Sequence, residues 1–533
     1  MASTSSTIHQ LLTNLLHLPK TRALQLSVSL LFFLNFLYLL TYFHHHSTSP
    51  STSPPPPPSS LLHRTTTKTL SPPRHPHRHR HLHPSTSSKP WPSLPSYLPW
   101  TPPSNSSSSC ESFFGNAFSR TSFILPRTSS ASWFGCSYNA GLRSSVCDGG
   151  KVLMDPSKIR MSDGGEKIDE VIGRSDEEEL PVFLPGSFRL RRREGEEETS
   201  PKRVVSEAFL DQFVPHGQIS RHTMRELFAN MELVGKSDFN CNEWIEEPTL
   251  LVTRFEYANV FHTYTDWYSS YVSSRVTGLP TRPNVVFLDG HARTQLEETW
   301  EALFSSIRFA KNFTGPVCFR HAVFVPLGYE TAWFKGLSEP IQCQGASAQG
   351  LWANPDDSKT ARLSEFGELV KSAFDLPVER LRTVKPSLEY NVLFVRREDY
   401  LAHPRHGGRV ESRLSNEQEV FDSLKTWASN HTDCRVNLVN GLFAHMSMRE
   451  QIRAIEDANV IIGAHGAGLT HVVSASPKTV ILEIISSQFQ RPHFQLISKW
   501  KCLDYHAINL PASSSDPEEV IERLKKIMKS IGC

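Results

Sequence analysis

One uncharged stretch near the N-terminus constrains this chain more than any other feature. Residues 23–43 read ALQLSVSLLFFLNFLYLLTYF and contain no Asp, Glu, Lys or Arg. At about 1.5 Å of rise per residue, a helix of this length spans the roughly 30 Å hydrocarbon core of a bilayer. The length of the stretch and the lack of a small-x-small motif after it favour a single uncleaved transmembrane helix over a removable signal peptide.

The charges beside this stretch predict its orientation. Lys20 and Arg22 precede it, and no Lys or Arg occurs between His44 and His63. Because basic residues remain on the cytosolic side, residues 1–22 are expected to form a cytosolic tail, with the rest of the chain across the membrane. This is the topology of a single-pass type II membrane protein.

Residues 44–108 are predicted to form a disordered stem. The stretch contains five consecutive prolines at 54–58 and the tract RHPHRHRHLH at 74–83, a composition that buries too little apolar surface to fold. We interpret the histidine tract as solvated linker, because nothing there fixes the geometry of metal ligands. The first 110 residues contain eight Lys or Arg and no Asp or Glu. The rest is mildly acidic, which argues against a nucleic-acid partner.

Cysteines and glycosylation motifs point to the secretory pathway. None of the nine cysteines forms a C-x-x-C pair, so zinc-ribbon spacing is absent. In an oxidising compartment some should pair, and the odd number leaves at least one over. The motif N-x-S/T occurs at Asn105, Asn312 and Asn430.

From Thr249 onward the chain alternates between predicted strands and helices, whereas residues 110–240 show no clear pattern. Strands are predicted at 249–255, 284–289, 316–325, 391–397, 436–439, 459–464 and 479–485, and helices at 257–276, 294–307, 447–458 and 516–531. This alternation is typical of parallel sheets in α/β proteins. We expect two Rossmann-like lobes facing a cleft, with an N-terminal lobe at 109–385 and a C-terminal lobe at 386–533.

A glycine-rich turn is the strongest local signal. The predicted strand at 459–464 continues into His465, Gly466, Ala467, Gly468 and Leu469. Glycine lets the backbone approach a phosphate, and the first N–H groups of the following helix can bind an anion. The spacing matches neither a dinucleotide fingerprint nor a P-loop. It therefore indicates a diphosphate site of another kind, although a plain tight turn with a structural histidine remains an alternative.

Two arginines and a glutamate lie on neighbouring strands. Arg396 and Arg397 end the strand at 391–397, where a guanidinium can form forked hydrogen bonds to phosphate. A salt bridge to a nearby acidic residue is the alternative, and we favour Arg396 over Arg397 for binding. Glu483 interrupts an apolar run, and ribose hydroxyls or other core groups could satisfy it.

The N-terminal lobe supplies a candidate catalytic pair. Asn259, His262 and Asp266 follow the strand at 249–255, and His262 and Asp266 share a helix face. A His–Asp pair can serve as a general base and its orienting partner, but a surface pair has the same spacing. Residues 289–291, Asp-Gly-His, lack the second carboxylate of a D-x-D metal site and are interpreted as a loop.

These residues also resemble a known family. The runs ANVFHTYTDW, VLFVRRED and GAHGAGLTH occur in the order found in family 61 glycosyltransferases. Longer runs at 89–103, 244–280, 391–408 and 446–477 are similar to the plant members of that family that add β-1,2-xylose to N-glycans.

The resemblance implies a GT-B-like fold and transfer of xylose from UDP-xylose to O2 of the core β-mannose, with inversion. It implies Asp266 as the base and His262 as its orienting partner or an acceptor contact, with Asn259 on the acceptor side. It implies a donor site made by Arg396, Arg397, the turn at 465–469 and Glu483. It further implies a Golgi membrane protein with a luminal body and no required metal or other cofactor.

Three other functions stay open from the sequence. The first is another family 61 activity, such as pentosyl transfer to xylan or O-linked N-acetylglucosamine transfer. The second is a glycosidase, which would need two facing carboxylates where only Asp266 stands out. The third is a non-catalytic, membrane-anchored protein that binds glycans.

Overall fold

The computed structural model describes residues 88–100, 109–121, 123–127, 131–193, 195, 200–217, 219–378, 389–397 and 413–533. The chain divides into two compact units, Met1–Leu82 and His83–Cys533, and every described residue belongs to the second. The predicted anchor at 23–43, most of the predicted stem and Asn105 lie outside the described residues. Within the described ranges, no helix combines the length and the apolar character needed to cross a bilayer.

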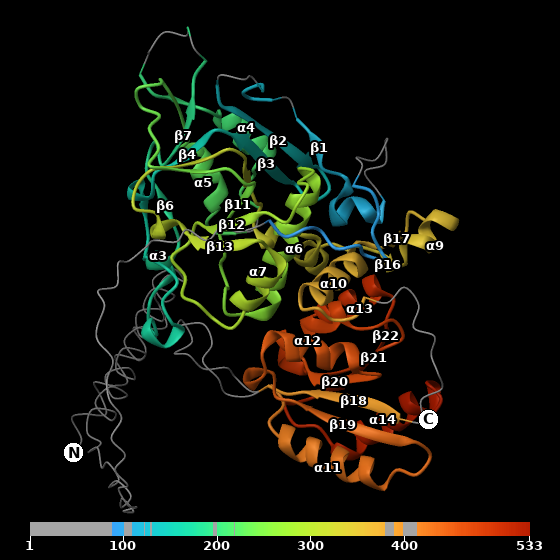
Figure 1. The fold of residues 1–533 in the computed structure, drawn as a ribbon. Coiled ribbons are helices and arrows are strands. Elements are labelled where there is room, and N and C mark those ends of the chain that lie inside the picture. Colours follow the sequence, from blue (N-terminus) through green and yellow to red (C-terminus); the bar gives the residue numbers. More distant parts are fainter. Residues whose placement is uncertain are drawn as a thin grey trace, which may run out of the picture. The chain divides into compact units, whose positions relative to one another are not determined.

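A seven-stranded sheet forms the centre of the N-terminal half (Figure 1). Its order is β1 (Ser119–Arg120), β2 (Trp133–Asn139), β3 (Ser144–Gly150), β15 (Ala322–Phe324), β11 (Thr249–Val252), β12 (Asn284–Phe287) and β13 (Ser306–Phe309). The last four strands are mutually parallel, and β3 joins them antiparallel through β15. The strands predicted near 249 and 284 are therefore confirmed as buried neighbours.

Two predicted elements differ from the structure. The single strand expected at 316–325 is two strands in two sheets, β14 (Val317–Phe319) and β15, with exposed Arg320 between them. The helix expected at 294–307 is a shorter helix, α7 (Glu297–Leu303), followed by strand β13. In both cases the apolar run indicated secondary structure at that place in the chain. Pairing with other strands in the fold determined where each element began and ended.

Residues 110–240, which showed no clear pattern, supply four strands of a second sheet. Its six strands are β10 (Glu243–Ile245), β14, β4 (Val152–Met154), β7 (Phe188–Arg191), β9 (Glu232–Val234) and β8 (Lys202–Arg203), and β5 (Ile159–Arg160) pairs separately with β6 (Val182–Phe183). Three short helices lie in this part: α3 (Asp176–Glu179), α4 (Glu207–Phe213) and α5 (Thr223–Ala229). These strands are too short for alternation to show in the sequence.

The C-terminal half is a doubly wound parallel sheet. Its order is β19 (Arg435–Gly441), β18 (Glu389–Val395), β20 (Val460–Ala464), β21 (Val480–Ser486) and β22 (Asp504–Leu510), with helices α11 (Glu417–Asn430), α12 (Met448–Asp457), α13 (His493–Lys501) and α14 (Pro517–Ser530). All four strand pairs are parallel. From β18 the order runs to β19 on one side and to β20 on the other, which makes this the topological switch point where ligands bind in such sheets.

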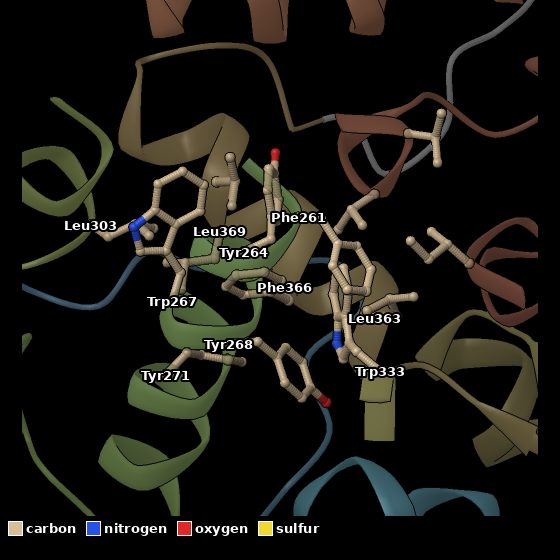
Figure 2. Close-up of a cluster of buried hydrophobic side chains, with 14 of the residues drawn as sticks. Phe261, Tyr264, Trp267, Tyr268, Tyr271, Leu303, Trp333, Leu363, Phe366 and Leu369 are labelled. Atoms are coloured by element: carbon tan, nitrogen blue, oxygen red, sulfur yellow. The ribbon is translucent and has the colours of Figure 1, made fainter. Parts of the chain in front are cut away.

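Helix α6 (Val260–Val276) is the hub between the two halves. Figure 2 shows its aromatic side chains, from Phe261 to Tyr271, packed against Trp333 of α8 (Ala332–Ser338) and Phe366 of α10 (Arg362–Ala373). Thirteen of its seventeen residues are buried, so neither face is solvated. The same core cluster continues into β18, β20 and β21, so the two halves share one hydrophobic core.

The ordered part of the chain begins earlier than expected. Residues 88–100, predicted as stem, lie along α10, where Ser96 N and Oγ donate to the two oxygens of Glu368 at 2.8 Å. The guanidinium of Arg362, with no exposed surface, donates to the carbonyls of Leu98 and Pro99 at 2.7 and 3.0 Å. Aromatic and apolar side chains in this segment let it fold onto the body, which the proline content had obscured.

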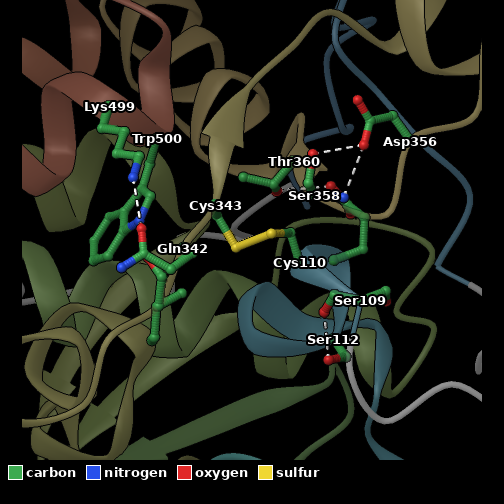
Figure 3. Close-up of a disulfide and its surroundings, with 12 residues drawn as sticks. Ser109, Cys110, Ser112, Gln342, Cys343, Asp356, Ser358, Thr360, Lys499 and Trp500 are labelled. Carbon is green, nitrogen blue, oxygen red and sulfur yellow. Dashed lines mark hydrogen bonds between the residues drawn. A yellow bond between two sulfur atoms is a disulfide. The ribbon is translucent and has the colours of Figure 1, made fainter.

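Four disulfides link the described chain: Cys110–Cys343, Cys136–Cys147, Cys241–Cys318 and Cys434–Cys533. The first joins residues 233 positions apart and fixes the segment after residue 109 beside β16 (Gln344–Gly345) (Figure 3). Cys502 is the unpaired ninth cysteine. The expectation of several pairs with one cysteine left over is confirmed.

Candidate functional site

The switch point between β18 and β20 brings together the two strongest sequence signals. Arg396 and Arg397 follow β18 directly, and His465 and Gly466 follow β20. The two strands are hydrogen-bonded neighbours, with Val395 opposite Gly463. The arginine pair and the glycine turn therefore lie at the same edge of the sheet, as the alternation of strands and helices indicated.

The two arginines point to different neighbours. Arg396 Nε lies 3.4 Å from Glu417 Oε2, and its guanidinium is 5.4 Å from the centre of the Phe421 ring, so it faces α11. Arg397 instead lies against the glycine turn: a Cβ on Gly466 would come within 2.8 Å of Arg397 Nη1. The structure thus favours Arg397, and not Arg396, as the arginine that reaches the turn.

The glycine turn opens a short 3-10 helix, η8 (Ala467–Ser474). Gly466 is its N-cap and has no side chain with which to cover the first N–H groups of the helix. These N–H groups belong to Ala467 and Gly468, at the sheet edge beside Arg397. An anion placed here would meet backbone donors and a guanidinium together.

His465 is oriented by a buried glutamate. Its Nδ1 donates to Glu483 Oε1 at 2.5 Å, and Glu483 Oε2 accepts from the hydroxyl of Tyr505 at 2.7 Å. Because Nδ1 faces a carboxylate, it carries a proton, and Nε2 is left for a ligand, to which it donates when the ring is protonated. Glu483 has no exposed surface and both of its oxygens have protein partners. It therefore fixes His465 here, where the sequence suggested a contact with ribose.

The sequence did not predict the group of basic side chains that surrounds His493, beside His465. His493 begins α13, and its ring centre lies 5.8 Å from that of His465 and 4.5 Å from that of Phe261 on α6. Burial lowers the pKa of His493 to about 3, assisted by the charges of His465, Arg491, His262 and Arg413. The available signal was a histidine in the segment after β21, since the segments that follow the strands of a doubly wound sheet lie at the ligand-binding edge.

Asn259 and His262 occupy the N-terminal turn of α6. Asn259 is the N-cap, and its Oδ1 accepts from the amide of Phe261 at 3.0 Å. Its side chain thus stabilises the helix start by roughly 1 kcal/mol, which differs from the expected acceptor contact. His262 is half-buried, with its ring centre 5.5 Å from Tyr329 and 5.3 Å from Phe334. The adjacent Phe261 contacts both the His262 ring and the His493 ring, so His262 lies on the side of α6 near His493.

Asp266 lies one helical turn deeper than His262. Its side chain is buried with 6% of its surface exposed, and its carboxylate accepts the amide hydrogen of Gly328. A Cβ on Gly328 would overlap Asp266 Oδ1, so glycine is needed for this approach. Burial raises the pKa of Asp266 well above its ordinary value, with the charge of Arg254 opposing the shift and that of Asp289 adding to it.

Asp289 belongs to a buried ion-pair network. Arg254 Nη2 donates to Asp289 Oδ1 at 2.8 Å, the amide of Arg254 donates to Oδ2 at 2.7 Å, and Arg254 Nη1 donates to Glu297 at 2.5 Å. Burial alone would raise the pKa of Asp289, but the charges of Arg254 and His291 more than offset it and lower that pKa. Asp289 thus pairs with an arginine inside the protein.

A polar chain links α6 to the helix of the glycine turn. The amide nitrogen of Gln451 donates to two backbone carbonyls, so its Oε1 accepts from His471 Nε2 at 3.0 Å. His471 Nδ1 then accepts from the hydroxyl of Tyr264 at 3.0 Å. Burial lowers the pKa of His471 to about 3, which keeps the ring neutral as this arrangement requires. No pattern in the sequence indicated this connection.

One cluster among the described residues has the composition of a metal site: His431, Cys434 and Cys533. Its two cysteines form a disulfide, so neither can serve as a thiolate ligand. The histidine tract at 74–83 lies outside the described residues. The described groups that could hold an anion are those at the edge of β18 and β20.

Comparison with known proteins agrees with this arrangement. Residues 214–482 match the model of the family Glycosyltransferase 61. The chain is 58% identical over 496 residues to a beta-1,2-xylosyltransferase of Arabidopsis thaliana, which covers 87% of this chain and 93% of that protein. It is 58% identical over 456 residues to a beta-1,2-xylosyltransferase of Oryza sativa subsp. japonica, which covers 84% of each.

A more distant relative matches a smaller part of the chain. The EGF domain-specific O-linked N-acetylglucosamine transferase of Gallus gallus is 23% identical over 284 residues, which is 51% of this chain and 46% of that protein. The family model runs from Val214, at the end of α4, into β21, and it includes α6, both arginines and the glycine turn. The chain therefore belongs to glycosyltransferase family 61.

Proposed function

We propose that this protein transfers xylose from UDP-xylose to O2 of the core β-mannose of N-glycans, with inversion to a β-1,2 linkage. The observation that carries the proposal is the 58% identity with two proteins named beta-1,2-xylosyltransferase, over 84% or more of the chain. The cationic groups at the switch point support it, because a nucleotide sugar brings a diphosphate that needs positive partners. The proposal includes a GT-B-like fold, in which the reaction takes place between two Rossmann-like lobes.

Asp266 is the proposed base. It takes the proton of the acceptor hydroxyl while that oxygen attacks the anomeric carbon and the bond from that carbon to the diphosphate breaks. The raised pKa of Asp266 makes its carboxylate a stronger base than an exposed one, which suits proton transfer near neutral pH. His262, on the same helix face and nearer the cationic group, is the proposed acceptor contact.

The leaving diphosphate is proposed to bind at the glycine turn. Arg397, His465 Nε2 and the backbone N–H groups of Ala467 and Gly468 would stabilise its growing negative charge; removing one such donor typically costs about 10²–10³-fold in rate. These cationic and backbone groups supply the charge that a metal ion would otherwise provide. We expect transfer to persist in EDTA, and loss of transfer that added Mn²⁺ restores would contradict this part.

The cellular setting is also a proposal: a Golgi membrane protein with a luminal body, anchored by residues 23–43. Four disulfides support an oxidising compartment, and Asn312 and Asn430 are both exposed and open to glycosylation. Protease protection of the body in sealed Golgi vesicles is the expected result. Digestion of the body without detergent would contradict this orientation.

The activity is tested by mass spectrometry of the full-length protein with UDP-xylose and an N-glycan that has N-acetylglucosamine on its core. The expected product gains one pentose in β-1,2 linkage, and Asp266→Asn abolishes the gain. Asp504→Asn, an exposed carboxylate on β22, serves as the matched control and should retain activity. A gain from UDP-N-acetylglucosamine in place of UDP-xylose would favour the activity named for the more distant relatives.

A further inference from the structure

His493 is a buried histidine with an unsatisfied ring nitrogen. Only 9% of its surface is exposed, and no described residue provides a hydrogen-bond partner for Nδ1. The ring lies between two parts of the proposed reaction site, 4.5 Å from Phe261 of α6 and 5.8 Å from His465 of the glycine turn, measured between ring centres. A buried polar nitrogen left without a partner costs free energy, which indicates that a ligand completes it.

The charged groups that act on His493 all have the same sign. They come from four places in the fold: His262 on α6, His465 after β20, Arg491 just before α13, and Arg413 just before α11. Together with burial they hold the pKa of His493 at about 3, so the ring is neutral at physiological pH. His493 is also the first residue of α13, a nine-residue helix, so backbone N–H groups that lack helical partners lie beside the ring.

We propose that His493 binds the diphosphate of the sugar nucleotide and takes up a proton when that ligand binds. The inference rests on the proposed function, because it takes a nucleotide sugar as the ligand. The described charges that act on the ring are positive, since the carboxylate of Glu483 is already paired with His465, and the two negative charges of a diphosphate reverse the field on the ring. The imidazolium then donates to a phosphate oxygen, and the proton comes from solvent.

Calorimetry of the full-length protein counts this proton. UDP-xylose is titrated without acceptor at pH 7.0 in PIPES, HEPES and Tris, and the dependence of the observed heat on buffer ionisation enthalpy gives the protons taken up. The two phosphates of UDP-xylose have no titrating group near neutrality, so the proton is bound by the protein. We expect uptake by the wild type and its loss in His493→Gln, with affinity about 10- to 100-fold weaker.

His506→Gln is the matched control. His506 lies on β22 of the same sheet, faces Asp504 at 3.3 Å and is about one-third exposed, so the proton number and affinity should not change. A second variant, Arg491→Gln, removes an exposed cation at the start of α13 and should weaken binding while proton uptake persists.

The outcomes separate this inference from the proposed function. Binding by the wild type with no proton uptake overturns the inference, as does equal uptake in His493→Gln; either result leaves the transferase activity intact. The wild-type proton number needs no variant, so misfolding of His493→Gln does not prevent the test. Failure of the wild type to bind UDP-xylose would overturn the inference and the proposed function together.

Discussion

Arg254 and His493 are both buried beside charged neighbours, but the signs of those neighbours differ. Arg254, in the N-terminal half, faces the carboxylates of Asp289 and Glu297, and its hydrogen bonds are used within the protein. His493, in the C-terminal half, faces His262, His465, Arg413 and Arg491, which are all basic. The first group of charges is balanced by the fold. In the second, Glu483 pairs with His465, and we propose that a ligand balances the positive field that acts on His493.

This difference separates structural charge from functional charge. A buried ion pair is complete before any substrate arrives, and removing one partner leaves the other without compensation. A group of like charges costs stability in the free protein and recovers it when an oppositely charged molecule binds. Asp266 lies near Arg254, but this positive charge does not offset the effect of burial on Asp266. The pKa of Asp266 is therefore raised, whereas that of Asp289 is lowered.

The largest expected effect sharpens the contrast between these two aspartates. Asp266→Asn should lower transfer by about 10²–10⁴-fold, the usual contribution of a positioned base. The same change should leave thermal stability equal or higher at neutral pH. The folded-state pKa of Asp266 lies above its unfolded value, so ionised Asp266 destabilises the fold as pH rises. A lower melting temperature together with normal turnover would contradict both expectations.

Asp289→Asn should show the opposite pattern in stability. Removing this charge leaves Arg254 short of a partner in the interior and should cost about 3–5 kcal/mol of the free energy of unfolding. Because the pKa of Asp289 is lowered in the fold, its contribution is present above the unfolded value near pH 4 and is lost as pH falls through the folded value. Urea unfolding at several pH values measures both effects, with Asp504→Asn as the exposed control. An unchanged free energy of unfolding would contradict the description of Arg254 and Asp289 as a buried ion pair.

The neighbouring arginines allow the comparison to be made within one dipeptide. Arg397→Gln should weaken UDP binding about 10- to 100-fold, because a charged donor to phosphate is lost. Arg396→Gln should change UDP affinity little, since Arg396 faces Glu417. Calorimetric titration of both variants with UDP compares their affinities directly. A larger loss of UDP affinity in Arg396→Gln than in Arg397→Gln would instead support the preference for Arg396 drawn from the sequence.

The smallest expected effect concerns the connection between the two halves. Tyr264→Phe and His471→Gln each break the chain from α6 to η8 and should each cost about 0.5–1.5 kcal/mol of stability. Because the two side chains are hydrogen-bonded partners, the double variant should cost less than the sum of the single ones. Strict additivity in a double-mutant cycle on urea unfolding would exclude this interaction.

The sequence predicted strands β18 to β21 of the C-terminal sheet, because β18, β20 and β21 contain long apolar runs. It did not predict the edge strand β22, which is only partly buried, or helices α11 and α13. It also placed Arg397 and Gly466 at one sheet edge, since the carboxyl ends of parallel strands meet there. It could not determine which arginine faces the turn. Successive residues after a strand point to opposite sides, and the register that assigns those sides is set by tertiary packing.

The rest of the site depends on contacts between distant segments. His493 and His262 come together only because α13 and α6 pack against each other, and no local pattern records that contact. The partners of Glu483 are hidden for the same reason, since Tyr505 lies on the neighbouring strand β22. In residues 110–240 every described strand except β2 and β3 has two to four residues, so pairing, and not a sequence pattern, defines these short strands.

The attachment of residues 88–100 to α10 determines how the folded body responds to a mechanical pull from its N-terminal side. Arg362, Glu365 and Glu368 lie three residues apart on one face of α10, and all three bind this segment through side-chain hydrogen bonds. Within its described residues the segment forms one isolated β-bridge, between Pro90 and Thr281, and no strand ladder. Gly367 of the same helix packs against Val473 of η8. Tension along the chain therefore meets first the bonds of Lys89 and Trp91 to residues 279–305, and only then the bonds to α10, the helix that supports the glycine turn.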